Sequence, residues 1–361
     1  MILNIGKVSI DLSLRGGIHM NGLTNSHSTN WLDGHHLGFL NLFVYVFIRH
    51  KRAEKDEIAS GRARGIEELS GGWPKPWLYS RVLILLLVAF GLLYGCMQVS
   101  EIASNLLPGV VALGSLIVPL TLLFFFFECN IFRNITLLSA LRYFLLGSCL
   151  SVAIVFALSY GLKLCESLRI PIPGWMGLDF KTWRPYGSLE YYSGSFMVVY
   201  ALFEEFGKGL IIFLFLRRFR NHCFILPSML IGAAVGAGFA VFESAGNTFG
   251  AMQNNLSLVS LLTNQLMAPV CHVAWGSLLG GGIALLSRKG LKAMVVFNPM
   301  FWMLFLGIAV LHFLWNYLQT GYLSWLLVLR VETWFVILCM IWAGVRQVRR
   351  FVALGRIPLQ M

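Results

Sequence analysis

The sequence predicts an all-α protein, a polytopic bundle of about eight transmembrane helices with both termini in the cytoplasm. Of its 361 residues, 57% are hydrophobic and only 12% are charged, and the mean hydropathy is +0.73. Soluble domains carry about 25% charged residues, so the composition excludes a water-soluble enzyme, a disordered tail and a nucleic-acid-binding module. The seven cysteines form no CxxC pair, and neither a zinc knuckle nor a disulfide framework is predicted.

The predicted spans are apolar runs long enough to cross about 30 Å of hydrocarbon, which takes about 20 helical residues. The first seven runs are 81–97, 106–127, 143–162, 194–216, 226–249, 258–286 and 300–318. The last span ends at Val345, but Arg330 and Glu332 would be costly at mid-membrane. We therefore expect residues 322–329 to lie at the interface, before a short helix that begins at Val331.

The basic residues support this topology independently of hydropathy, because Lys and Arg collect on the cytoplasmic side of membrane proteins. The N-terminal segment, the alternate loops and the C-terminal tail together hold 22 of them, whereas the opposite loops hold four. Both termini are therefore predicted to be cytoplasmic. The net charge of +12 is explained by the membrane, and no nucleic-acid partner is expected.

The chain divides into three predicted parts. Residues 1–80 form a cytoplasmic or membrane-surface segment, 81–345 form the transmembrane bundle, and 346–361 form a basic cytoplasmic tail. Within the first part, residues 37–48 are apolar but only about 18 Å long as a helix, so we expect a membrane-surface helix. A ninth span that begins near Trp31 is the alternative. No signal peptide is expected at the start of the chain.

Spans four to seven contain ionisable residues, although spans one to three contain no Asp, Glu, His or Lys. These residues are Glu204, Glu205, Lys208, Glu243, His272 and His312. An ionisable group within the hydrocarbon costs a few kcal/mol, so six of them in four consecutive spans indicate a shared purpose. Four of the six, one from each span, lie 13 to 16 residues from the cytoplasmic end of the span, at a depth of roughly 20 to 24 Å. We therefore expect them around one cavity in the outer half of the bilayer.

The residue types of this layer suit hydrolysis of a peptide bond by either of two routes. In the first route, Glu204 or Glu205 activates water as a general base, with Lys208 as charge partner. His312 and Asn316, which are four residues apart on one helix face, then stabilise the oxyanion. In the second route, His272, His312 and Glu243 ligate Zn²⁺, as in His₂Glu catalytic zinc sites.

Four motifs in this order resemble those of a known family. Residues 204–208, EEFGK, resemble the EExxK motif of the PrsW family of intramembrane proteases, and residues 239–243, FAVFE, resemble its FxxxE motif. Residues 272–276, HVAWG, and 312–316, HFLWN, are similar to its later histidine motifs. The family is grouped with the CAAX-type prenyl-protein endopeptidases and bacteriocin-processing proteases. Relative to that wider group, Lys208 replaces an arginine and Glu243 replaces a histidine.

The resemblance implies a multi-pass protein of the bacterial cytoplasmic membrane that cuts membrane-anchored proteins, of which anti-sigma factors are the implied class. Its partners would then be the lipid bilayer and a membrane-anchored substrate. Two other functions remain open from the sequence. A transporter or proton relay also places carboxylates and histidines in its spans. A non-catalytic scaffold of the same fold would keep the motifs without turnover.

Overall fold

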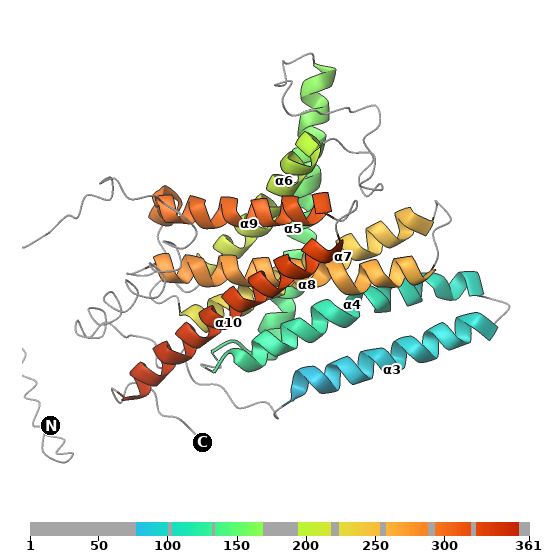
Figure 1. Ribbon diagram of the computed structural model, residues 1–361, viewed down its shortest axis with the longest axis horizontal. Helices are drawn as coiled ribbons and strands as arrows, with labels where there is room; N and C mark the ends of the chain where they lie inside the picture. Colours follow the sequence, from blue (N-terminus) through green and yellow to red (C-terminus); the bar gives the residue numbers. More distant parts are fainter. Residues whose placement is uncertain are drawn as a thin grey trace, which may run out of the picture. The chain divides into compact units, whose positions relative to one another are not determined.

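The computed structural model describes residues 77–99, 103–131, 134–168, 194–217, 224–252, 258–287, 293–318 and 323–353, all within one compact unit. These residues form eight α-helices and one short 3₁₀ helix, and no strand occurs among them (Figure 1). The α-helices are α3 (Leu78–Val99), α4 (Ala103–Cys129), α5 (Leu137–Ser167), α6 (Gly194–Leu216), α7 (Ile225–Met252), α8 (Leu258–Leu286), α9 (Pro299–Leu318) and α10 (Leu323–Ala353). The 3₁₀ helix η6 (Ala293–Phe297) precedes α9.

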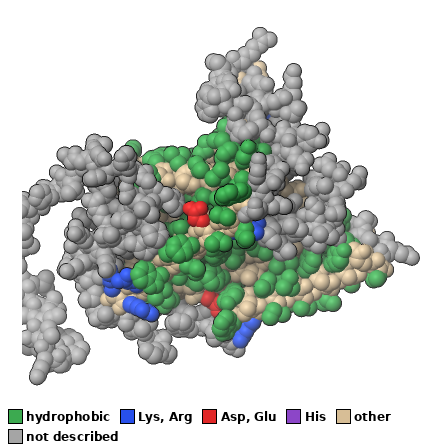
Figure 2. Space-filling model, viewed as in Figure 1, with side chains coloured by type: hydrophobic (Ala, Val, Ile, Leu, Met, Phe, Trp, Pro, Cys, Tyr) green, Lys and Arg blue, Asp and Glu red, His purple; other side chains and the backbone are tan. Residues whose placement is uncertain are grey.

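The helices confirm the predicted all-α transmembrane class. Seven of those described are long and apolar enough to cross a membrane. The remaining helix, α6, has the same bounds as the predicted fourth span, and its three charged residues, Glu204, Glu205 and Lys208, lie close together at its middle. Hydrophobic side chains cover most of the described surface on the face shown in Figure 2, as expected for a surface that contacts lipid. The side of the membrane on which each end lies stays a prediction.

Helices α7 and α8 form the centre of the bundle. Most residues of both helices are buried, and the two contact each other along their length. Around them lie α4, α5, α6, α9 and α10, each of which contacts α7 or α8. At the periphery, α3 lies alongside α4 and has no buried residue (Figure 1). The functional candidates predicted from the sequence lie on α6 to α9, at and beside this centre.

Glycines allow the α7 and α8 backbones to touch. A Cβ atom at Gly236 would collide with the backbone carbonyl of His272, and one at Gly232 would collide with that of Gly276. Small residues at such positions are the usual means by which membrane helices pack closely. Because the carbonyl that Gly236 contacts belongs to His272, this packing also fixes the backbone of a predicted site residue.

The prediction of a short last helix that begins at Val331 was wrong, whereas the interfacial position of residues 322–329 stays a prediction. Helix α10 is continuous from Leu323 to Ala353, and its apolar span begins at Trp325. Arg330 is accommodated because its guanidinium carbon lies 4.7 Å from the ring centroid of Trp315 on α9. An arginine over an indole face keeps a favourable electrostatic partner when it leaves water, so the helix need not break there.

The predictions for the N-terminal segment fall outside the described residues. These are the membrane-surface helix at 37–48 and its alternative, the ninth span near Trp31. The boundary at residue 81 and the basic tail at 346–361 stay predictions as domain divisions, although α10 continues through Arg346 to Ala353.

Candidate active site

Helices α6 to α9 bring the predicted ionisable residues together inside the bundle. Glu204, Glu205 and Lys208 come from α6, Glu243 from α7, His272 from α8 and His312 from α9. All are 1% exposed or less except Glu243, of which 14% of the side-chain surface is exposed. Within this buried polar cluster, Glu243 on α7 is therefore the side chain that reaches the surface.

The Glu205 carboxylate forms hydrogen bonds with two other members of this polar cluster. Its Oε1 atom lies 2.6 Å from Lys208 Nζ and 2.7 Å from His312 Nδ1. Because a carboxylate accepts only, His312 Nδ1 carries the proton and donates it to Glu205. The Nε2 atom of His312 is consequently left with a free lone pair. A histidine oriented in this way by a carboxylate is the usual arrangement behind a metal ligand.

Lys208 links Glu205 to His272 through its ammonium group. Besides Glu205, the Nζ atom lies 3.0 Å from His272 Nδ1, and an ammonium group can only donate in that contact. Nζ also lies 4.7 Å from the ring centroid of Phe239 and 5.9 Å from that of Trp275. The fully buried cation is thus held by one carboxylate, one imidazole and two aromatic faces, which compensates for its loss of water.

Two more carboxylates each lie beside the Nε2 atom of one histidine. Glu204 Oε2 lies 3.3 Å from His312 Nε2, and Glu243 Oε2 lies 2.5 Å from His272 Nε2. Within the described part of the chain, Glu204 Oε2 and His312 Nε2 are buried and form no hydrogen bond. Buried polar atoms are nearly always satisfied in native proteins, so two unpartnered atoms side by side indicate a site for another group.

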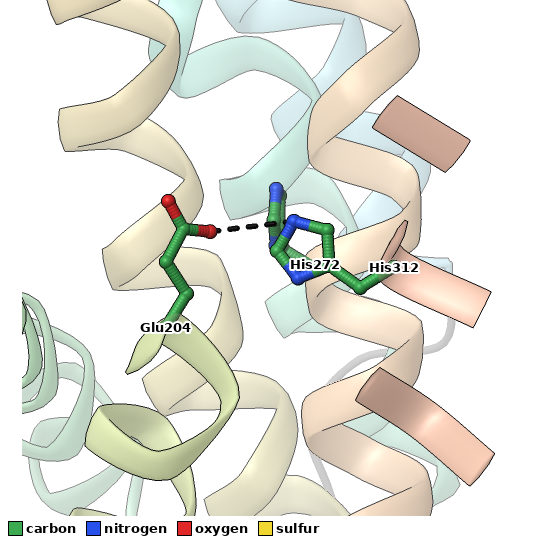
Figure 3. A group of neighbouring side chains, drawn as sticks. All are labelled: Glu204, His272 and His312. Carbon is green, nitrogen blue, oxygen red and sulfur yellow. Dashed lines mark ion pairs between the residues drawn. The ribbon is translucent and has the colours of Figure 1, made fainter. Parts of the chain in front are cut away.

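The donor set fits a divalent metal ion. Ligand atoms of Glu204, His272 and His312 lie within 4.8 Å of one another, and Figure 3 shows the three side chains converging from different helices. Three carboxylates and one ammonium give the polar cluster a formal charge of −2, which a divalent cation would balance. The structure thus groups Glu204 with the two histidines, whereas the expected ligand set contained Glu243. A metal held by His272 would displace a proton, because both of its nitrogens face other groups.

Asn316 lies one turn after His312 on α9 and is 7% exposed. The shared face predicted for this pair follows from their i, i+4 spacing on one continuous helix. The role of Asn316 as a hydrogen-bond donor stays a prediction.

Sequence reasoning missed two residues, Trp275 beside the polar cluster and Arg330 within the last span. Trp275, also on α8, has its ring centroid 4.9 Å from that of His312 and 5.4 Å from that of His272. Arg330 on α10 was assigned to an interface, although an arginine within a span is itself a functional signal. Nothing in a single sequence reveals the Trp275 contacts, because they depend on how α8 and α9 pack.

The fold and the polar cluster define a class of protein, a multi-pass helical membrane protein with a buried Glu/His/Lys centre whose donors suit a metal. The comparison with protein families agrees with this class. A model described as PrsW family intramembrane metalloprotease matches residues 137–345, which is more than half of the chain. The chain belongs to the PrsW family of intramembrane metalloproteases, as the motif resemblance indicated. Searches of curated proteins and of solved structures give no match.

The matched region begins at α5 and runs into α10, so it contains the whole polar cluster. Helices α3 and α4 precede it. Membership of this family makes the protein a peptidase of the membrane in general terms, with the lipid bilayer and a membrane protein as its partners. The substrate, the roles of individual residues and the identity of the metal are matters for the proposal that follows.

Proposed function

We propose that this protein is an endopeptidase that hydrolyses peptide bonds of membrane-anchored proteins in the outer half of the bilayer. The observation that carries the proposal is the convergence of Glu204, His272 and His312, with ligand atoms within 4.8 Å of one another. The free Oε2 atom of Glu204 and the free Nε2 atom of His312 strengthen it. These are the atoms that a metal-dependent hydrolase needs and that a purely structural polar core would pair.

In this proposal Glu204, His272 and His312 hold Zn²⁺, whose catalytic sites are commonly built from histidine and carboxylate ligands. Bound there, zinc would supply Lewis-acid activation of the peptide carbonyl and of the attacking water. Glu205 orients His312 by accepting a hydrogen bond from its Nδ1–H, and Lys208 balances the charge of Glu205. The protein thereby presents preformed ligands in a region from which bulk water is excluded.

Proton transfer falls to Glu243 in this arrangement. It is the most exposed carboxylate of the polar cluster, and its Oε2 atom lies beside His272 Nε2. A carboxylate so placed can take a proton from water during attack and return it to the leaving amine. The roles assigned from the sequence are therefore exchanged, since Glu243 acts as base and Glu204 as ligand. Asn316 is proposed as a donor to the oxyanion.

The substrate class proposed is a membrane-anchored protein of the anti-sigma-factor type in a bacterial cytoplasmic membrane. Support comes from the family and from the predicted depth of the polar cluster, which lies nearer the outer surface. At this depth a substrate segment that leaves its helix near the outer interface would reach the cluster by way of Glu243. A segment cut on the cytoplasmic side would lie farther from it.

Purified protein reconstituted in liposomes with a single-pass reporter tests the proposal. Glu204→Ala and His312→Ala should each lower the cleavage rate by at least about 10³-fold, because each removes a metal ligand. The matched control is Glu128→Gln, since Glu128 accepts hydrogen bonds from the first residues of α3, far along the chain from the polar cluster. Chelator should abolish cleavage by the wild type, and Zn²⁺ should restore it. Full activity in both alanine variants would refute the proposal.

A further inference from the structure

One more buried polar atom beside the polar cluster lacks a partner. Trp275 is 2% exposed, and its indole Nε1 has no hydrogen-bond partner among the residues that the structure describes. Buried N–H groups in native proteins are paired in more than about nine of ten cases. An indole N–H is a donor only, so the group that satisfies it must be an acceptor.

The ring of Trp275 lies against the polar cluster. Its ring lies 4.9 Å from the His312 ring at an interplanar angle of 32°, and 5.4 Å from the His272 ring at 85°. Lys208 Nζ lies 5.9 Å from its centroid. Trp275 thus packs against both histidines and the only cation of the cluster.

The remaining groups of the polar cluster explain why a neutral donor is needed there. Glu204, Glu205 and Glu243 present acceptor oxygens, which would repel the carbonyl oxygen of an incoming peptide. The ammonium of Lys208 is already occupied by Glu205 and His272. A transmembrane substrate segment, for its part, offers mainly backbone carbonyls as acceptors once its helix opens.

We propose that the Trp275 indole N–H donates a hydrogen bond to a backbone carbonyl oxygen of the peptide substrate during cleavage. This inference rests on the proposed function and assigns a further catalytic residue to it. The ring of Trp275 packs against the histidines, and its N–H positions the peptide. Because the hydrogen bond strengthens as negative charge develops on that oxygen, its loss should affect kcat more than KM.

The first test is Trp275→Phe in the reconstituted full-length protein, which keeps an aromatic ring beside His312 and removes the donor. We expect kcat to fall by about 10²-fold, the effect of removing one oxyanion donor, with a much smaller change in KM. The control is Trp302→Phe, because the Trp302 side chain is 46% exposed and its Nε1 already donates to the Val296 carbonyl. The kcat of Trp302→Phe should stay within about threefold of the wild type, a change well below the loss caused by removing one oxyanion donor.

Replacement of Trp275 by benzothienylalanine guards against a folding defect, since this residue has nearly the shape of tryptophan without the N–H. The same loss of kcat is expected. Wild-type activity in the benzothienylalanine protein would overturn the inference, whatever the phenylalanine variant does.

A spectroscopic measurement separates this inference from the proposed function. The indole N–H band in the ultraviolet resonance Raman spectrum, taken as wild type minus Trp275→Phe, reports the hydrogen bond of Trp275 alone. Addition of the reporter's transmembrane peptide to Glu204→Ala protein, compared with the Glu204→Ala/Trp275→Phe double variant, should shift the band toward a stronger hydrogen bond without any cleavage. An unshifted band with bound peptide would overturn the role of Trp275 and leave the endopeptidase proposal standing. A shifted band in a wild type that does not cleave would do the reverse.

Discussion

Glu205 on α6 accepts the Nδ1 hydrogen bond of His312 on α9 at 2.7 Å, and this contact determines which nitrogen of the histidine is free. The opposite nitrogen, Nε2, then faces the Glu204 carboxylate at 3.3 Å. Two adjacent glutamates therefore have different environments, because successive positions on a helix point about 100° apart. Glu205 orients His312 and pairs with Lys208, whereas Glu204 keeps one oxygen atom without a hydrogen-bond partner.

Glu205→Gln is expected to reduce activity without abolishing it. Glutamine keeps the shape but is a weaker acceptor for His312, and loss of such an orienting carboxylate lowers metal affinity or activity by about 10- to 100-fold. The measurements are reporter cleavage and zinc content of the purified protein. Glu332→Gln on α10, where the side chain is exposed, is the matched control. A loss as large as that of Glu204→Ala would contradict the division of roles.

Lys208→Met is expected to destabilise the fold by about 3 to 5 kcal/mol, because it leaves a buried carboxylate without its counter-charge. The free energy of unfolding in detergent micelles measures the loss. Adding Glu205→Gln to Lys208→Met should restore part of the stability, since the uncompensated charge is then gone. If the double variant is as unstable as the sum of the single variants, the ion pair is not what holds Lys208.

Gly236→Ala is expected to lower both stability and activity. Its methyl group would collide with the backbone carbonyl of His272, and overpacking of this kind costs about 1 to 3 kcal/mol. Thermal unfolding and reporter cleavage should both register the change, since the shift moves a metal ligand. Gly95→Ala on α3 is the control, because no atom lies within 4 Å of the added carbon there. Equal effects at the two glycines would argue against close α7–α8 packing.

Arg330 and Trp315 are expected to couple energetically. Their stacking at 4.7 Å joins α10 to α9 one turn from His312, and a cation–π contact of this kind contributes about 0.5 to 2 kcal/mol. A double-mutant cycle with Arg330→Ala and Trp315→Leu isolates the pair from the other contacts of the arginine. A coupling energy near zero would show that another contact accommodates Arg330 within the span.

The sequence predicted the helices well where an apolar run had clear ends. Gly194–Leu216 and Leu258–Leu286 have the predicted bounds. The depth count also anticipated that Glu204 and His312 lie at one level, because the rise of a helix is regular. The prediction for α10 failed because it assumed that Arg330 would bear the full free-energy cost of leaving water. The Trp315 ring face that lowers this cost belongs to another helix.

Two features of the site could not be predicted. One is which carboxylate, Glu204 or Glu243, groups with the two histidines as a candidate metal ligand, and the other is the set of contacts that Trp275 makes. Both depend on the rotation and tilt of α7 and α8 about their axes, which packing sets and periodicity does not. The motifs identified the residue types, and the packing of the helices decided which atoms meet.

The measurement that tests the account most directly is the fate of a single-pass membrane reporter incubated with reconstituted protein in ¹⁸O-labelled water. Mass spectrometry should find one labelled oxygen in a new C-terminal carboxyl group, at a bond in the outer half of the reporter's transmembrane segment. The labelled product should be absent with His312→Ala and present with Glu128→Gln. If the wild-type protein forms no labelled product, or if His312→Ala forms as much of it as the wild type, the claim that this buried Glu–His centre hydrolyses peptide bonds is contradicted.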